Sequence, residues 1–252
     1  MSSSTLPPLM TAAGVLGYIL GSVPFAVLVA RRHGVDILKV GSGNPGATNV
    51  KRVLGRGPGN LVFLLDALKG TVAAGWPALA ALALAWVDGN SAGAASGIKE
   101  ATFASLAGEG GASGVFSAFF GLLRDGEKVA AAQLAGFVGA VLGHCFSLFL
   151  RFRGGKGVAV SAGGLLGVMP VCLGASGIVW LVVFCLTRYV FAASLAAGVS
   201  LPVVTWFWFS GAATPQFWIS VAVAAFLVFT HRENIRRWRA GTENRFSKKT
   251  PS

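Results

Sequence analysis

The chain has 252 residues, of which 54% are hydrophobic and only 12% are charged, and its mean hydropathy is +0.68. Soluble domains carry charge on about a quarter of their residues, so this composition excludes an ordinary soluble protein and indicates a membrane protein. The net charge of +12 suggests nucleic-acid binding, but the cations are confined to loops between apolar segments, so we expect no nucleic-acid partner.

Uncharged apolar segments predict the membrane-spanning helices, because a helix needs about 20 apolar residues to cross the hydrocarbon core. In chain order the expected spans are residues 9–30, 60–87, 129–150, 157–170, 171–187, 190–209 and 217–230. The segment 157–170 is short for a full crossing, and the alternative is a half-helix buried in protein. If 157–187 forms a single crossing with one more after it, five spans replace seven and the orientation stays the same.

The basic residues predict the orientation, since loops rich in Lys and Arg stay on the cytoplasmic side. Basic loops cover residues 31–59 and 151–156, and the tail 231–252 is also basic, whereas the loop 88–128 carries more acids than bases. We therefore expect an all-α integral membrane protein with its N-terminus outside and its C-terminus in the cytoplasm. Residues 1–252 are expected to form a single polytopic domain, with 88–128 as an external loop insertion and 231–252 as a basic cytoplasmic tail.

Two charged residues lie inside an expected span. Asp66 and Lys69 are three positions apart, so on a helix they share a face. Ionisable residues within a membrane are functional candidates. The alternative, which we favour, is a structural ion pair near the inner end of the span.

The first polar cluster is the loop segment Gly41-Ser-Gly-Asn-Pro-Gly-Ala-Thr-Asn-Val-Lys-Arg52. Its glycines let several backbone N–H groups point to one side, an arrangement that binds anions. The Ser and Thr hydroxyls add donors, and the planar Arg fork matches phosphate. A plain polar loop with turn glycines is the alternative, but the density of anion donors favours a phosphate site.

The second polar cluster is Gly143-His-Cys-Phe-Ser-Leu-Phe-Leu-Arg-Phe-Arg-Gly-Gly-Lys-Gly157. Its last four residues precede an apolar helix, whose N-terminus offers free N–H groups and a positive dipole end to an anion. This is not a nucleotide-binding P-loop, because Gly157 follows Lys156 where Ser or Thr would bind magnesium. His144, near the cytoplasmic end of its span, is interpreted as structural in preference to catalytic.

The third polar cluster is His231-Arg-Glu-Asn-Ile-Arg-Arg237, followed by Gly241-Thr-Glu-Asn-Arg245. If the last span continues as a helix, His231 and Asn234 share a face at the membrane boundary. His231 is then a candidate general base or phosphate ligand. A basic tail at the membrane surface is the alternative, and it explains the arginines but not His231 and Asn234.

The sequence contains no carboxylate cluster suited to magnesium and no His–Cys spacing suited to a transition metal. Its polar clusters are rich in cations, amides and glycines instead. We therefore expect a site without a metal or other cofactor.

Together the three clusters resemble the motifs of the bacterial acyl-phosphate:glycerol-3-phosphate acyltransferases, the membrane enzymes of the first step of phospholipid synthesis. The motif Ser-Gly-Asn-x-Gly-Ala-Thr-Asn-x-x-Arg matches residues 42–52. The motif Gly-His-x-Phe-Ser with Phe-Arg/Lys-Gly-Gly-Lys-Gly matches 143–157, and His-Arg-x-Asn-Ile-x-Arg matches 231–237. Two positions depart from the family pattern: Val160 stands where Thr is expected and Phe191 where Ser is expected, so neither is assigned to the site.

The resemblance implies a seven-span fold in the bacterial cytoplasmic (inner) membrane, with the site on the cytoplasmic side. It implies acyl phosphate as donor and glycerol 3-phosphate as acceptor, with 1-acylglycerol 3-phosphate and phosphate as products and the acyl chain among membrane lipid. The catalytic residues that it implies are Ser42, Arg52, Lys156, His231 and Asn234. The substrate-binding residues that it implies are Gly43, Asn44, Gly46, Thr48, Asn49, Gly154, Gly155, Gly157, Ser194 and Glu233.

The expected mechanism is direct transfer, because an acyl phosphate is already activated and needs mainly positioning and charge stabilisation. The proton of the attacking hydroxyl passes to His231 or to a substrate phosphate oxygen, and the sequence does not choose between them. An acyl-enzyme on Ser42 is a further alternative, although no base neighbours it in sequence. The rival class is a transporter or channel for phosphate-bearing small molecules, but the chain has no clear internal repeat and its cations lie at one face.

Overall fold

The computed structural model describes residues 6–87, 127–209 and 214–246. Within them all regular structure is helical, as expected: α1 (Leu6–Ser22), α2 (Phe25–Arg32), α3 (Ala47–Leu54), α4 (Arg56–Val87), α7 (Glu127–Cys145), η2 (Leu148–Leu150), α8 (Val158–Val168), α9 (Pro170–Thr187), α10 (Val190–Trp208), α11 (Pro215–Thr230) and α12 (Arg232–Arg239). The expected external insertion, 88–128, lies outside the described residues up to position 126, and so does the end of the tail from 247.

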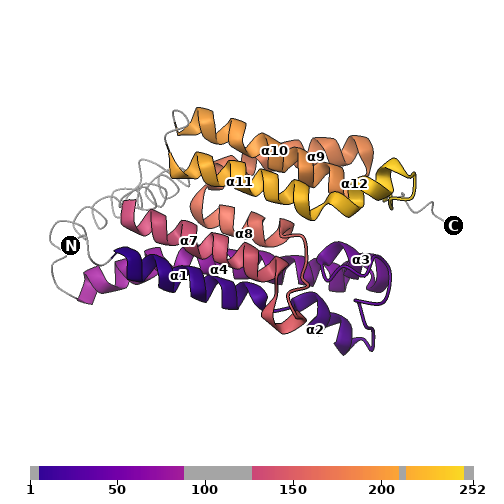
Figure 1. The fold of residues 1–252 in the computed structure, drawn as a ribbon, viewed down its shortest axis with the longest axis horizontal. Helices are drawn as coiled ribbons and strands as arrows, with labels where there is room; N and C mark the ends of the chain where they lie inside the picture. The colour runs from indigo at the N-terminus through magenta and orange to yellow at the C-terminus, as the bar shows by residue number, and fades with distance from the viewer. Residues whose placement is uncertain (1–5, 88–126, 210–213, 247–252) are drawn as a thin grey trace, which may run out of the picture.

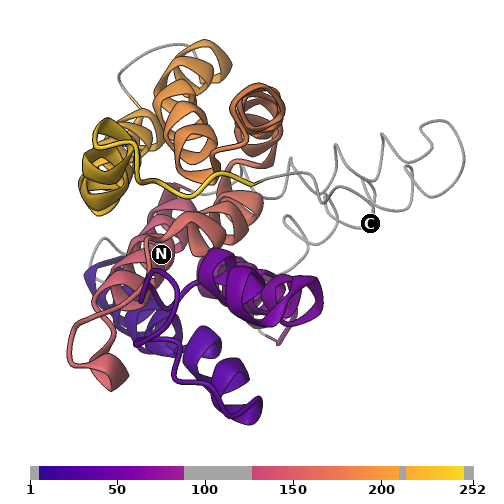
Figure 2. The ribbon, with the colours of Figure 1, turned by 90° about the vertical axis from the view of Figure 1, so that its right-hand side faces the viewer.

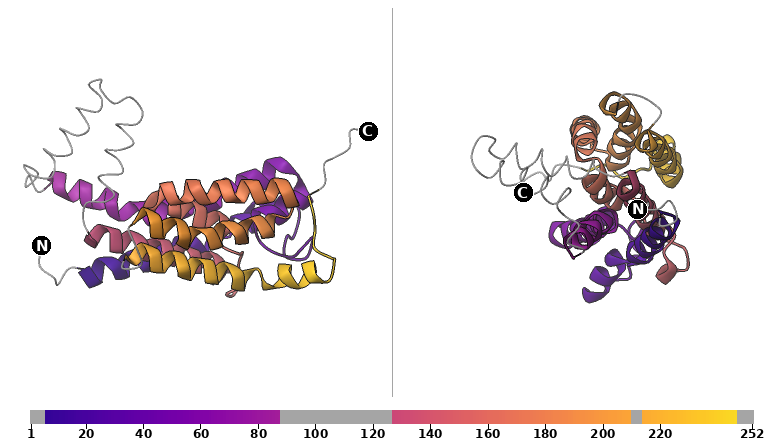
Figure 3. Two further views of the ribbon diagram at one scale, coloured as in Figure 1. Left: turned by 90° about the horizontal axis from the view of Figure 1, so that it is seen from above. Right: turned by 90° about the vertical axis from the view of Figure 1, so that its left-hand side faces the viewer.

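The helices lie side by side in an elongated bundle, in which α1 begins at one end and α12 lies at the other (Figures 1 and 3). In the described part, five helices are long and apolar enough to cross a membrane, with α1 and α2 taken together, and α8 and α11 are shorter apolar helices. Large apolar side chains point outward, such as Leu186 (75% exposed) and Phe207 (79% exposed), whereas Thr205 and Ser220 are buried. This surface suits lipid, and the chain is a multi-pass membrane protein.

Small residues bring the first group of helices close together. Helix α1 packs against α7, and α4 packs against both α7 and α8. A Cβ atom added at Gly17 would overlap the carbonyl oxygen of Gly136, and one added at Gly163 would overlap that of Ala67. Such close backbone contact is typical of membrane helices, whose association depends on van der Waals packing.

The second group contains α9, α10 and α11, and α10 packs against both of the others. Seen end-on, this group lies apart from α1 and α4, with α8 between the two groups (Figure 2; Figure 3, right). A continuous core joins them, because Phe137 of α7 and Val160 of α8 share one buried cluster with Leu201 and Leu227.

Helix α8 corresponds to the short segment expected at 157–170. It has 11 residues, most of them buried, as the half-helix alternative requires. It ends at Val168, because the next residue, Met169, has a φ of −141°, which is not helical. A residue before proline is pushed out of the helical region, and Pro170 opens α9.

Two expected boundaries at the start of the chain differ from the structure. The expected span 9–30 is broken, because α1 ends at Ser22 and α2 begins at Phe25. Pro24 has no N–H group with which to continue the helical hydrogen bonds. The expected loop 31–59 also contains α3, and α4 begins at Arg56 instead of at position 60.

All three polar clusters lie at the same end of the bundle, which is formed by α3, the loop before α8 and α12 (Figures 1 and 2). We call this the polar end and define it by α3, residues 151–157 and residues 231–246. Segments far apart in sequence therefore contribute to a single region.

Candidate functional site

Lys156 joins the second polar cluster to the third. Its ammonium group donates to the side-chain oxygen of Asn234 on α12. The hydroxyl of Thr230, at the end of α11, donates to the Lys156 carbonyl oxygen at 3.1 Å. These bonds dock the loop before α8 onto the junction of α11 and α12, so two residues that the motifs assign to one site are in contact.

His231 lies at the junction between α11 and α12 and is 3% exposed. Its Nδ1 lies 2.8 Å from the carbonyl oxygen of Leu227. A carbonyl oxygen only accepts, so Nδ1 carries the proton and Nε2 has a free lone pair. Burial, followed by the positive charge of Lys156, lowers the pKa of His231 to about 4. The ring is therefore neutral at pH 7 and presents Nε2 as a hydrogen-bond acceptor.

Glu243 holds Asn234 in place and was not predicted from the sequence. Its Oε1 accepts from Asn234 Nδ2 at 2.8 Å, and its Oε2 accepts from Arg237 Nε at 2.8 Å. The carboxylate side chain is only 6% exposed. Residues 231–246 contain only two acids, Glu233 and Glu243, among several arginines. An acid in so basic a segment is a candidate partner for the cations, and this signal could have pointed to Glu243.

Arg52 brings the first polar cluster to the other two. It lies on α3, and its Nη1 is 3.4 Å from Oδ1 of Asn49. Partial burial lowers the pKa of Arg52, Glu243 raises it, and Arg237 lowers it. The charges of Glu243 and Arg237, both in the tail segment, therefore act on Arg52 of α3.

The polar end has an excess of positive charge around Lys156. The pKa of Lys156 is lowered to about 8, chiefly by burial and then by the charge of Arg237, with Glu243 raising it and Arg52 lowering it. Glu233 also raises this pKa. Three cations and two acids thus act around this position, and the remaining positive charge suits a doubly charged phosphate. Within the described ranges, no group of three or more His, Cys, Asp or Glu residues could hold a metal ion.

Asn49 organises the first polar cluster from the inside. Its Nδ2 donates to the carbonyl oxygens of Ile37 and Val40, at 3.2 and 3.0 Å. Its Oδ1 accepts from the N–H group of Ser42 at 2.9 Å and from Arg52. The amide is 1% exposed, so it shapes the loop and orients Arg52, a use that differs from the expected direct contact with phosphate.

The other predicted residues of the first cluster remain accessible. Ser42 is exposed, and Asn44 and Thr48 are half-buried. Gly43 has a φ of 68°, in the left-handed region that favours glycine. Gly46 is the N-cap of α3 and supplies no side-chain cap, so the first N–H groups of that helix can bind other partners.

Gly154 and Gly155 bind the end of α7. Their N–H groups donate to the carbonyl oxygens of Cys145 and His144, each at 3.0 Å. A helix end leaves such carbonyls without partners, so the N–H groups of these two glycines complete α7. Gly157, with a φ of 86°, is the N-cap of α8 and supplies no side-chain cap, which leaves the first N–H groups of α8 for an anion.

Two predicted residues are not drawn into this cluster. The hydroxyl of Ser194 donates to the carbonyl oxygen of Val190 at 2.9 Å and accepts from Nε1 of Trp180 at 3.2 Å. Glu233 pairs with Arg236 at 2.7 Å on the surface, with its own side chain 49% exposed. Neither contacts Lys156 directly through a hydrogen bond in the part of the chain that the structure describes.

An apolar groove of about 590 Å³ lies beside the polar end, between α10 and α12. Its lining includes Phe191, Ala192, Leu195, Trp238 and Arg245. Phe191, which stands where the family pattern has Ser, contacts the ring of Trp238 at a centroid distance of 6.5 Å. The departure at this position therefore adds an apolar wall to the groove.

Comparison with known proteins gives a consistent result. The sequence model described as Glycerol-3-phosphate acyltransferase matches residues 11–241. A glycerol-3-phosphate acyltransferase of Thermus thermophilus is 40% identical over 246 residues, covering 95% of this chain and 98% of the relative. Another, from Agrobacterium fabrum, is 35% identical over 246 residues, covering 97% and 96%.

Two crystal structures are similar to this one, both of PlsY (YgiH), an integral membrane glycerol 3-phosphate acyltransferase. Its glycerol 3-phosphate form has a TM-score of 0.68 and 31% identity, covering 94% of this chain and 96% of that one. Its lysophosphatidic acid form has a TM-score of 0.66 and 30% identity, covering 94% and 95%. The matched residues 11–241 include the motifs of all three polar clusters. The chain therefore belongs to the glycerol-3-phosphate acyltransferase family.

Proposed function

We propose that this multi-pass membrane protein transfers an acyl group from acyl phosphate to glycerol 3-phosphate in phospholipid synthesis. The observation that carries the proposal is the contact of Lys156 with Asn234, with Arg52 electrostatically coupled to Lys156. Family membership supports acyl transfer to glycerol 3-phosphate, and the two similar structures carry the names of a glycerol 3-phosphate form and a lysophosphatidic acid form.

The cations of the polar end supply the binding energy for phosphate. Arg52 and Lys156 hold the phosphate of the acceptor, and the first N–H groups of α8 face the same region. Gly43, Asn44, Gly46 and Thr48 belong to the accessible loop that would enclose the substrate. Charge of this kind stabilises phosphate already in the ground state and also as it departs from an acyl phosphate.

The reaction is a direct displacement at the acyl carbon. The 1-hydroxyl oxygen of glycerol 3-phosphate forms the new ester bond, and the bond between the acyl carbon and the phosphate oxygen breaks. The electron pair of that bond leaves with the phosphate. Ser42 is exposed and no base in the described ranges hydrogen-bonds its hydroxyl, so the mechanism has no acyl-enzyme step.

The proton of the attacking hydroxyl passes to the departing phosphate. The pKa of His231 is lowered to about 4, whereas a phosphate monoanion ionises near a pKa of about 6. The phosphate is thus the stronger base. His231 accepts a hydrogen bond from the glycerol at Nε2 and orients it, and Asn234 holds the Lys156 ammonium.

The groove between α10 and α12 is suited to the acyl chain. It is lined by apolar side chains on one side of the polar end, close to Asn234 through the neighbouring Ile235 of α12. Acyl phosphate has a charged head and an apolar tail, and this site offers cations next to a lipid-facing groove. The polar end then lies on the cytoplasmic side of the inner membrane. Basic loops are retained on that side, and both phosphate substrates reach it from water.

The experiment is an acyl-transfer assay on the purified protein in detergent, with acyl phosphate and labelled glycerol 3-phosphate. We expect lysophosphatidic acid and one equivalent of phosphate, at the same rate with magnesium or with a chelator. Acyl-CoA in place of acyl phosphate tests the donor. If no donor gives product, the proposal is wrong. If only acyl-CoA gives product, the donor is acyl-CoA and not acyl phosphate.

A further inference from the structure

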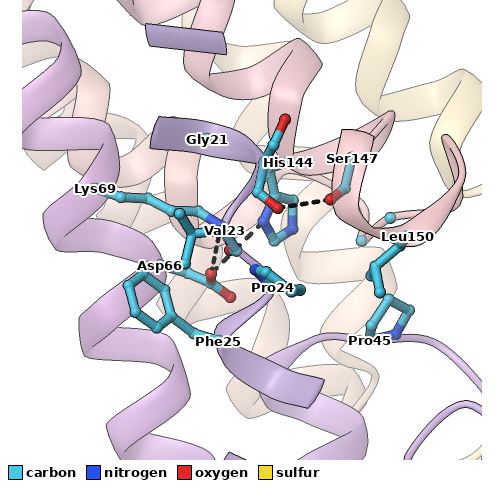
Figure 4. A pocket seen from close by; sticks show the side chains of 13 residues that line it. Gly21, Val23, Pro24, Phe25, Pro45, Asp66, Lys69, His144, Ser147 and Leu150 are labelled. Atoms are coloured by element: carbon cyan, nitrogen blue, oxygen red, sulfur yellow. Dashed lines mark hydrogen bonds and ion pairs between the residues drawn. The ribbon is translucent and has the colours of Figure 1, made fainter. Parts of the chain in front are cut away.

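A second charged cluster lies inside the membrane span, away from the phosphate-binding cations. Lys69 Nζ lies 2.8 Å from Oδ1 of Asp66, and both side chains are 2% exposed. The expected ion pair within α4 is therefore present. Nδ1 of His144, on α7, lies 3.6 Å from the same carboxylate oxygen. Figure 4 shows the three side chains converging on one small cavity.

This cluster also satisfies the break between α1 and α2. Lys69 Nζ donates to the carbonyl oxygen of Val23 at 2.9 Å. The hydroxyl of Ser147, just after α7, donates to the carbonyl oxygen of Ser22 at 2.6 Å. The break at Pro24 leaves the carbonyl groups of Ser22 and Val23 outside a regular helix, where side chains can bind them. The ion pair on α4 is thereby tied to α1 and to the end of α7.

His144 connects the ion pair to the loop that carries Lys156. The His144 carbonyl oxygen accepts from the Gly155 N–H group at 3.0 Å. A Cβ atom added at Gly155 would overlap Nε2 of the His144 ring, so the loop rests directly on that ring. Lys156 is the next residue. A path of direct contacts therefore runs from Asp66 through His144 to Gly155 and Lys156.

We propose that Asp66 and Lys69 are positioning residues, which set the His144 ring and thereby the place of Lys156 at the polar end. This inference rests on the proposed function in one respect, because the binding of glycerol 3-phosphate is the quantity that the experiment measures. Burying a full ion pair is expensive, and apolar side chains of the same shape often give equal stability. If the pair only stabilised the fold, neutral residues at positions 66 and 69 could replace it. Holding the His144 ring beside Gly155, by contrast, needs a carboxylate at position 66.

The test is the neutral double variant Asp66→Asn/Lys69→Met, which keeps the shapes and removes both charges. We expect it to fold, with an unfolding temperature near that of the wild type. We expect the KM for glycerol 3-phosphate to rise about tenfold, because a small displacement of a binding group is costly, while the KM for acyl phosphate changes less than about twofold. The matched control is Asp36→Asn/Lys39→Met, which removes an exposed pair of the same spacing, 3.4 Å apart.

A second variant follows the same path from its other end. Gly155→Ala leaves the ion pair intact but drives a methyl group into the His144 ring. We expect the same selective rise in the KM for glycerol 3-phosphate. The triple variant should show no further rise, because residues acting through one path are not additive.

Three results would overturn the proposal. The first is a double variant with the wild-type KM for glycerol 3-phosphate. The second is an additive rise in the triple variant. The third is a double variant that fails to fold, because the pair would then be a stability element. Lack of turnover by the wild-type protein would instead contradict the proposed function, and binding of glycerol 3-phosphate, measured calorimetrically, would then replace KM as the readout.

Discussion

The Lys156 ammonium donates to the side-chain oxygen of Asn234, and this bond joins the loop before α8 to helix α12 across 78 positions of the chain. Asn234 also donates to Glu243, so one amide connects a cation of the site to an acid of the tail. The bond makes the site depend on the docking of α12, because the loop before α8 makes no other side-chain hydrogen bond to that helix among the described residues.

The first prediction concerns this amide. Asn234→Ala leaves the Lys156 ammonium without its side-chain partner and Oε1 of Glu243 without the Asn234 amide, while Oε2 of Glu243 keeps Arg237. Leaving a buried polar group unpaired costs about 1–3 kcal/mol, so kcat/KM for glycerol 3-phosphate should fall roughly tenfold to a hundredfold. Steady-state kinetics measure this, with Asn244→Ala as the control on the exposed side of the tail. Equal kinetics in the two variants would contradict the role given to Asn234.

A second prediction separates the two acids of the tail. Glu243→Ala removes the partner of Arg237 and Asn234 from a nearly buried position. The free energy of unfolding should fall by about 2 kcal/mol, which lowers the unfolding temperature by roughly 4–8 °C. Glu233→Ala breaks only an exposed pair with Arg236, which is worth about 0–1 kcal/mol. Thermal unfolding in detergent compares them, and equal shifts would argue against the buried role of Glu243.

The third prediction is a pH dependence of substrate binding. The pKa of Lys156 is lowered to about 8, so its charged form is lost as the pH rises through that value. Glycerol 3-phosphate loses its second proton near a pKa of about 6. The KM for glycerol 3-phosphate should therefore be lowest between about pH 6 and 8 and should rise above pH 8. A KM that stays constant to about pH 9.5 would show that the Lys156 charge does not bind the substrate.

The fourth prediction distinguishes two asparagines of the first polar cluster. Asn49→Ala removes the hydrogen bonds to Ile37, Val40 and Ser42 from a buried position. The loop should become sensitive to limited proteolysis and the activity should fall. Asn44→Ala, at a half-buried position, should leave proteolysis unchanged and raise the KM for glycerol 3-phosphate. Similar protease sensitivity of both variants would contradict this division.

The fifth prediction concerns the groove. Ala192→Phe fills part of a space lined by Leu195 and Trp238. Turnover with hexadecanoyl phosphate should fall severalfold more than turnover with decanoyl phosphate, because the longer chain loses more apolar contact. The control is Val199→Phe, two turns further along α10, 57% exposed and not among the residues that line the groove. The same loss for both donors would place the acyl chain elsewhere.

Most of the fold was predictable, because membrane crossing depends on local composition. The apolar runs predicted the spanning helices, and the shortness of 157–170 predicted the short helix α8. Pro24 could have predicted the break between α1 and α2, because a proline inside a span removes a helical hydrogen-bond donor. Helix α3 was missed because half of its residues are polar and it carries no long apolar run.

Within the site, the sequence alone determined which chemical groups are available: cations, an asparagine, a histidine and glycines in three clusters, at positions that hydropathy assigns to one face. It could not determine how each group is used, because a hydrogen bond depends on distance through space. Only the tertiary structure decided three contacts. Glu243 accepts a hydrogen bond from Asn234, the Asn49 side chain hydrogen-bonds within its own loop, and Gly155 packs against His144. Each of these contacts joins residues 9 to 12 positions apart that a loop brings back together, and composition and spacing do not specify how a loop folds back.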